Sequence, residues 1–146
     1  MLDALELRKI ADNHLKVAEL SFDAGLYENA IYVGGYCIEC LLKAKICDLL
    51  ELDNLFDPLF DKKEMAKSFK THDLIALLYL AGLKEKAITA KASNLNFSNY
   101  WKYLCENWSE QVRYDIIGSK TRDDADFFLE AINHPLNGVK QWILTN

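Results

Sequence analysis

The sequence predicts an all-α fold in a single domain over residues 1–146, and three observations support this prediction. The composition is 51% hydrophobic and 27% charged over 146 residues, so the chain is able to bury roughly two thirds of the surface that its unfolded form exposes. Only 6 glycines and 2 prolines are present, which leaves few positions at which short strands would begin and end. Apolar residues also recur at steps of three and four, as they do on one face of an α-helix.

The first helix is expected over residues 2–24. Its apolar stripe consists of Leu7, Ile10, Ala11, His14, Val17, Ala18 and Ser21. Gly25 is expected to end this helix, because glycine adopts the left-handed conformation that commonly follows a helix C-terminus.

The second helix, expected over residues 27–50, is apolar around most of its circumference. One side holds Ala30, Val33, Cys37, Cys40, Leu41, Ala44 and Cys47, and its flanks hold Ile31, Ile38, Leu42 and Leu49. A helix of this kind is buried against more than one neighbour, and we expect a flank to serve as a dimer surface. Gly34 and Gly35 each cost up to about 1 kcal/mol relative to alanine in mid-helix, so we expect a neighbouring helix to approach closely there.

Shorter elements are expected in the remainder of the chain. They are an irregular segment over 51–70 with a short helix over 62–68, helices over 72–83 and 84–92, a helix beginning at Thr121 and a last helical segment over 136–144. Thr71 is a candidate cap for the helix over 72–83. Thr121 followed by Asp124 is typical of a capped start, and Pro135 is expected to separate the last two helical segments.

Composition also restricts the possible partners. The formal net charge of −5 argues against broad electrostatic binding to nucleic acid, and we expect no binding to DNA. No apolar run approaches the roughly 20 residues that cross a bilayer, and residues 1–11 lack the pattern of a secretion signal, so we expect no membrane association.

The four cysteines, Cys37, Cys40, Cys47 and Cys105, are expected to be reduced thiols in a cytoplasmic protein. Cys37 and Cys40 form a CxxC pair inside a helix, without the second pair that a zinc site requires. We therefore interpret them as core thiols and expect neither a metal nor a cofactor.

Two features of the sequence are candidates for chemistry. Glu39 and Lys43 lie one helical turn apart in the orientation that favours an ion pair, which is either a surface pair or a pair facing a cleft or partner. His72 opens a predicted helix, where the positive end of the helix dipole favours a neutral imidazole that accepts a proton or a hydrogen bond. The alternative for His72 is a capping or packing role. His14 is expected to be a hydrogen-bonded core residue, and His134 to mark the helix bend before Pro135.

Three segments occur in an order that resembles the HEPN domain family: "YENAIYVGGYCIECLLKAKI" (27–46), "THDLIALL" (71–78) and "VRY" (112–114). The resemblance implies an antiparallel up-and-down bundle of four to five helices that commonly forms a homodimer. Members of the family act as metal-independent ribonucleases or as partners of nucleotidyltransferases.

Catalytic members carry an arginine followed after four to six residues by a histidine, and Arg113 is not followed by one at that spacing. The literal match from Arg8 to His14 lies in the first helix, where six steps of about 100° leave the side chains roughly 120° apart. We therefore predict a non-catalytic HEPN-like module that binds a nucleotide, RNA, or a protein such as a nucleotidyltransferase or an antitoxin.

The residues that we expect to bind the ligand are Glu39, Lys43, His72, Asp73, Arg113 and Tyr114. One alternative is a metal-independent endoribonuclease of a toxin–antitoxin or defence system, in which His72 and Arg113 are the catalytic candidates. A second alternative is a purely structural interaction protein.

Overall fold

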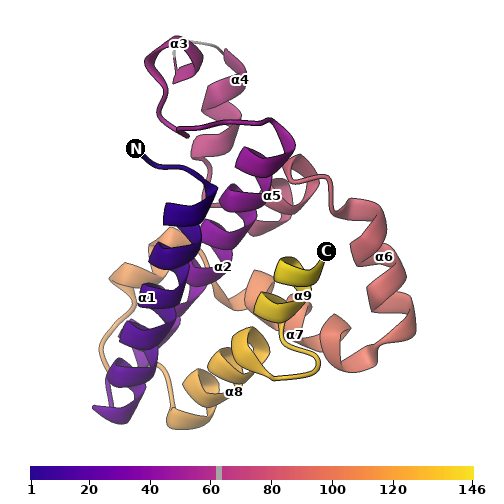
Figure 1. The fold of residues 1–146 in the computed structure, drawn as a ribbon. Coiled ribbons are helices and arrows are strands. Elements are labelled where there is room, and N and C mark those ends of the chain that lie inside the picture. The colour runs from indigo at the N-terminus through magenta and orange to yellow at the C-terminus, as the bar shows by residue number, and fades with distance from the viewer. Residues whose placement is uncertain (62–63) are drawn as a thin grey trace.

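Helix α2 (Tyr27–Leu49) is the element around which the rest of the chain packs, as Figure 1 shows for this computed structural model. The structure describes residues 1–61 and 64–146, and within these ranges every regular element is helical. Helix α1 (Ala4–Asp23) lies along one side of α2, and α8 (Arg122–Asn133) and α9 (Val139–Thr145) also contact α2. The predicted all-α bundle is confirmed.

The turn between α1 and α2 forms where the sequence predicts it. Gly25 has a φ of +76°, and its amide donates to the carbonyl of Phe22 at 2.9 Å while that of Leu26 donates to Ser21 at 2.8 Å. These bonds occupy carbonyls that the end of α1 would otherwise leave unpaired. At the other end, the side chain of Asp3 accepts from the amide of Glu6 and caps α1.

The flanks of α2 are covered by the chain itself. Ile31, Ile38 and Leu42 are all 1% exposed or less, which confirms that α2 is buried against several neighbours. These three residues are therefore not available to a second copy of the chain, contrary to the expectation that they contribute to a dimer surface. Leu49, at the end of α2, is 57% exposed.

The two adjacent glycines of α2 allow two different close approaches. A Cβ atom on Gly34 would lie 3.2 Å from Ile132 and 3.3 Å from Phe128, both on α8. A Cβ on Gly35 would overlap the indole ring of Trp108. The expected helix approach is confirmed at Gly34, whereas at Gly35 the close neighbour is an aromatic side chain at the end of α7 (Leu95–Asn107).

The other elements are short. They are α3 (Pro58–Asp61), α4 (Glu64–Lys67), the 3-10 helix η1 (Ser68–Lys70), α5 (Leu74–Leu80), α6 (Lys84–Ser93) and the 3-10 helix η2 (Glu110–Tyr114). The predicted helix over 62–68 matches α4 in part, and its first two residues, Lys62 and Lys63, lie outside the described residues. The capping box at Thr121 and Asp124 is confirmed, and His134 ends α8 just before Pro135, as expected.

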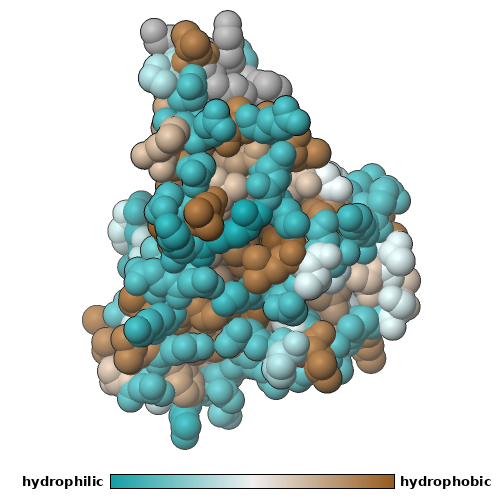
Figure 2. All heavy atoms as spheres, viewed as in Figure 1, coloured by the Kyte–Doolittle hydropathy of each residue, from teal (hydrophilic) through white to brown (hydrophobic). Residues whose placement is uncertain are grey.

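The surface is mainly hydrophilic on the face drawn in Figure 2, with separate apolar patches between the polar side chains. None of the helices in the described ranges has the length and hydrophobicity needed to cross a membrane.

Candidate functional site

Glu39 is a charged side chain in the core of the bundle. It lies in the middle of α2 and is 4% exposed. Its Oε1 accepts from Nζ of Lys43 at 2.6 Å, and its Oε2 lies 2.9 Å from Nδ1 of His72. Because an uncompensated buried charge is costly, these two partners make the burial of Glu39 possible. The pair predicted at Glu39 and Lys43 is thus an interior pair and not a surface pair.

His72 does not open a helix, contrary to the sequence-based expectation. Asp73 is the N-cap of α5, and its Oδ1 accepts from the amides of Ile75 and Ala76 at 2.9 and 3.1 Å. Thr71, the expected cap, accepts instead from the amide of Asp73 through Oγ1 at 3.1 Å. His72 therefore lies in the turn before α5, and the dipole argument does not apply to it.

The hydrogen bond to Glu39 orients the imidazole of His72. A carboxylate only accepts, so Nδ1 is the donor and Nε2 is left for another partner. The side chain is 39% exposed, so part of the imidazole is accessible to a ligand.

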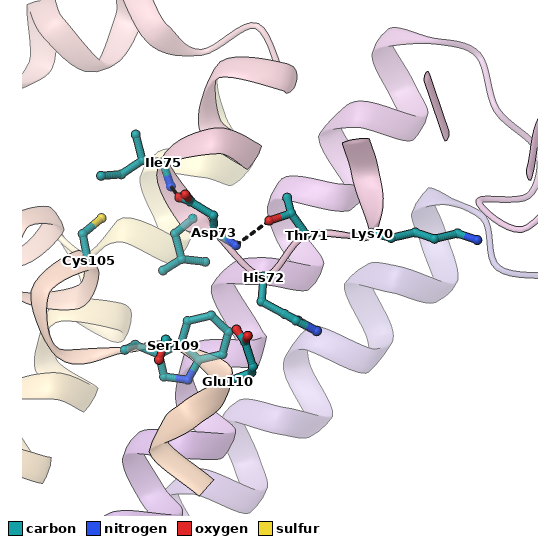
Figure 3. Close-up of a pocket in the computed structure, with 10 residues that line it drawn as sticks. Lys70, Thr71, His72, Asp73, Ile75, Cys105, Ser109 and Glu110 are labelled. Carbon is teal, nitrogen blue, oxygen red and sulfur yellow. Dashed lines mark hydrogen bonds between the residues drawn. The ribbon is translucent and has the colours of Figure 1, made fainter. Parts of the chain in front are cut away.

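A cleft of about 580 Å³ lies beside this turn. Lys70, His72 and Asp73 line one side, and Cys105, Trp108 and Glu110 line the other. Figure 3 shows His72 projecting from the turn, with Ser109 and Glu110, at the start of η2, below the turn in this view. The volume is within the range of small-molecule sites. Glu39 and Lys43 do not line this cleft, and Glu39 reaches it only through His72.

Tyr36 is the centre of an aromatic cluster behind His72. Its ring centroid lies 5.9 Å from that of His72, 5.1 Å from that of Trp108 and 5.2 Å from that of Tyr32. The three interplanar angles are between 81° and 88°, the edge-to-face geometry that aromatic pairs prefer. Trp108 is fixed by a 2.9 Å hydrogen bond from Nε1 to the carbonyl of Tyr32.

Arg113 and Tyr114 lie at the edge of this cluster. The guanidinium of Arg113 is 4.8 Å from the centroid of the Tyr114 ring, and Tyr114 is 69% exposed. The phenols of Tyr114 and then Tyr32 raise the pKa of Arg113. Burial is the main cause that raises the pKa of Tyr36, and the charge of Arg113 opposes it. Arg113 is therefore close to the Tyr32–Tyr36 edge, but neither Arg113 nor Tyr114 lines the cleft.

His14 is a member of the cluster that the sequence interpretation missed. It is half-buried rather than in the core, and its ring centroid lies 5.8 Å from that of Tyr36. Burial lowers the pKa of His14, and the charge of Glu39 opposes this effect. A signal was present in the sequence, because residues 14 and 36 are each eleven positions from Gly25. Residues equally distant from the turn of an antiparallel helix pair lie side by side.

Arg8 plays no part in this cluster, since its guanidinium forms an ion pair with Asp48 near the end of α2. The structure thus places Arg8 beside Asp48 and His14 beside Tyr36.

All four cysteines are free thiols. Burial raises the pKa of Cys37 and Cys105 to about 12, and that of Cys40 and Cys47 to about 11. The predicted burial in the core is confirmed for Cys37 and Cys47, whereas Cys40 is only partly buried, as is Cys105. Within the described residues, no three His, Cys, Asp or Glu side chains are grouped so that they could hold a metal ion.

Comparison of the chain with models of known protein families, with curated proteins and with solved structures finds no match.

Proposed function

We propose that this chain is a HEPN-like module that binds a phosphorylated ribonucleotide, free or as a segment of RNA, without cleaving it. One observation carries the proposal. A buried ion pair, Glu39 with Lys43, holds the imidazole of His72 at the rim of a cleft of about 580 Å³. A fold retains a charged group in its core at a cost, so a buried charge that orients an accessible side chain is a candidate for function.

The chemistry around the cleft suits a nucleotide. Imidazole, ammonium and guanidinium groups all bind phosphate. The imidazole of His72 lines the cleft, while Lys43 lies behind it on Glu39 and Arg113 lies beside Tyr114, outside the cleft. Aromatic rings stack on bases, and the exposed ring of Tyr114 is adjacent to Arg113. The net charge of −5 favours a single nucleotide or a short segment over a long RNA, because a long RNA requires many phosphate contacts.

The test is a calorimetric titration with 5′-AMP and with a short all-ribose oligoadenylate. His72→Ala and Arg113→Ala are each expected to weaken binding by about tenfold or more, the loss of one hydrogen bond to a charged group. Arg122→Ala is the matched control, because Arg122 also lies over an aromatic ring, that of Phe22 at 5.5 Å, away from the cluster. Binding by neither probe, or equal losses in all three variants, would contradict the proposal.

A homodimer in the cytoplasm is part of the proposal. Tyr114, Ile116 and Ile117 are 69%, 81% and 92% exposed in and after η2, and exposed apolar side chains in a row are typical of interaction surfaces. Light scattering at micromolar concentration is expected to give twice the mass of the chain. A monomer would remove this part of the proposal, and a stable complex with a nucleotidyltransferase or an antitoxin would show that the surface binds a different protein.

A second candidate function is a metal-independent endoribonuclease, and the hydrogen bond between Glu39 and His72 favours it. A carboxylate that fixes the tautomer of an imidazole leaves its other nitrogen able to take a proton from a ribose 2′-hydroxyl. Arg113 would then stabilise charge on the phosphorus centre. This candidate predicts RNA cleavage in EDTA that both His72→Ala and Arg113→Ala abolish. Intact RNA after long incubation contradicts it.

A further inference from the structure

His14 and His72 approach Tyr36 from two different elements. His14 comes from α1 and His72 from the turn before α5, and their ring centroids lie 5.8 and 5.9 Å from that of Tyr36. Both imidazoles are also close to Glu39, since His72 bonds to it and its charge acts on His14. Two segments far apart in the sequence thus bring two imidazoles to one cluster.

Each of these imidazoles has hydrogen-bonding capacity that the chain does not use. In the part of the chain that the structure describes, the ring of His14 makes no hydrogen bond, and Nε2 of His72 makes none either. To the extent that burial separates these nitrogens from water, it costs free energy that a hydrogen bond to a ligand would recover. The two oxygens of Glu39 already accept from Lys43 and His72.

We propose that His14 and His72, both in ring contact with Tyr36, contact the phosphate group of the bound ribonucleotide, and that binding takes up a proton. This inference rests on the proposed function and adds a second residue and a ligand group to it. A protonated imidazole donates from both nitrogens, so Nε2 of His72 is able to donate to a phosphate oxygen while Nδ1 donates to Glu39. An uncharged nucleoside would not use either contact.

The surrounding charges determine how binding depends on pH. Helix α2 contributes Glu39 and Lys43 together with the phenols of Tyr32 and Tyr36, η2 contributes Glu110 and Arg113, and the turn before α5 contributes Asp73. Burial lowers the pKa of His14, so its imidazole is neutral at neutral pH without a ligand. A phosphate dianion favours the protonated form, and affinity therefore falls as pH rises above about 6.5, by up to about tenfold per pH unit for each proton taken up.

The test is a titration with 5′-AMP in which proton NMR follows the resonances of the imidazole rings. The short oligoadenylate and adenosine are titrated for comparison. The chain has three histidines, and His134 is an internal control because its Nδ1 accepts from the amides of Leu136 and Asn137 at the end of α8. Addition of 5′-AMP is expected to shift the resonances of His14 and His72 and to leave the resonance of His134 in place. Adenosine is expected to move none of the three.

His14→Gln keeps a polar side chain and removes the titrating group. It is expected to weaken 5′-AMP binding at pH 6 by about tenfold and to make the affinity less dependent on pH. The equilibrium between monomer and dimer is expected to stay unchanged. If calorimetry detects binding and the His14 resonance stays in place, the inference is wrong and the proposed function stands. If neither 5′-AMP nor the oligoadenylate binds, both are wrong.

Discussion

Nδ1 of His72 lies 2.9 Å from Oε2 of Glu39, although the two residues are 33 positions apart in the sequence. The bond connects the middle of α2 to the turn before α5. The cluster therefore depends on the packing of the whole bundle, and its variants should affect stability as well as binding.

Glu39→Gln is expected to lower the free energy of unfolding by about 3 kcal/mol, because it leaves Lys43 with no charged partner at a side-chain exposure of 12%. Urea denaturation measures this change. Lys102 and Glu106 have the same spacing, but their side chains are 71% and 60% exposed. Glu106→Gln is therefore expected to cost less than about 0.5 kcal/mol. Equal costs at the two positions would show that burial of Glu39 is unimportant.

Gly35→Ala is expected to destabilise the protein by about 2 kcal/mol or more, because the new methyl group overlaps the indole of Trp108. Displacement of this ring also breaks its hydrogen bond to Tyr32, so the tryptophan fluorescence and near-UV circular dichroism should change. Gly34→Ala is the matched control. Its Cβ meets side chains at 3.2 Å or more, and the gain in helix propensity of up to about 1 kcal/mol offsets the crowding. A larger loss in Gly34→Ala than in Gly35→Ala would contradict this account.

The free energy of unfolding is expected to decrease as pH falls below about 6.5, in part because of His14. Burial lowers the pKa of His14 in the folded protein, so the unfolded chain binds a proton more readily. This stability is present above the pKa of the unfolded chain and is lost as pH falls through the pKa of the folded state. Urea denaturation between pH 5 and pH 8 measures the effect, and His14→Gln should make the dependence weaker. An unchanged dependence would show that His14 is not a buried titrating group.

The thiols are expected to react slowly in the folded protein. Burial raises the pKa of Cys40 and Cys47 to about 11, so at pH 8 only about one thiol in a thousand is the reactive thiolate. Reaction with a chromogenic disulfide at pH 8 should be slow for all four cysteines and rapid in denaturant. A fast phase in the native protein would show that a thiol is more exposed than the structure describes.

The local signals in the sequence predicted the fold well, because the determining interactions are short-range. Gly25 between two amphipathic stretches predicts the turn from α1 to α2, and Thr121 with Asp124 predicts the start of α8. The sequence predicted Thr71 as the cap of the next helix, whereas the cap of α5 is Asp73. Both residue types cap helices, and only the geometry of the turn selects Asp73.

The composition of the site was only partly predictable. The spacing of Glu39 and Lys43 predicted their ion pair, but no local pattern predicts that His72 binds the other carboxylate oxygen. The apolar stripe of the first helix predicts a core position for His14. The structure places His14 at the edge of that stripe instead, half-buried beside Tyr36. Arg113 was expected at the binding site, and the structure places it near Tyr32, outside the cleft.

The most direct test of the account is a crystal structure of the protein grown with saturating 5′-AMP. The account predicts a phosphate oxygen within about 3.2 Å of Nε2 of His72, with the hydrogen bond between Nδ1 and Glu39 retained. A nucleotide bound elsewhere, with His72 making no contact to it, would contradict the assignment of the cluster as the binding site.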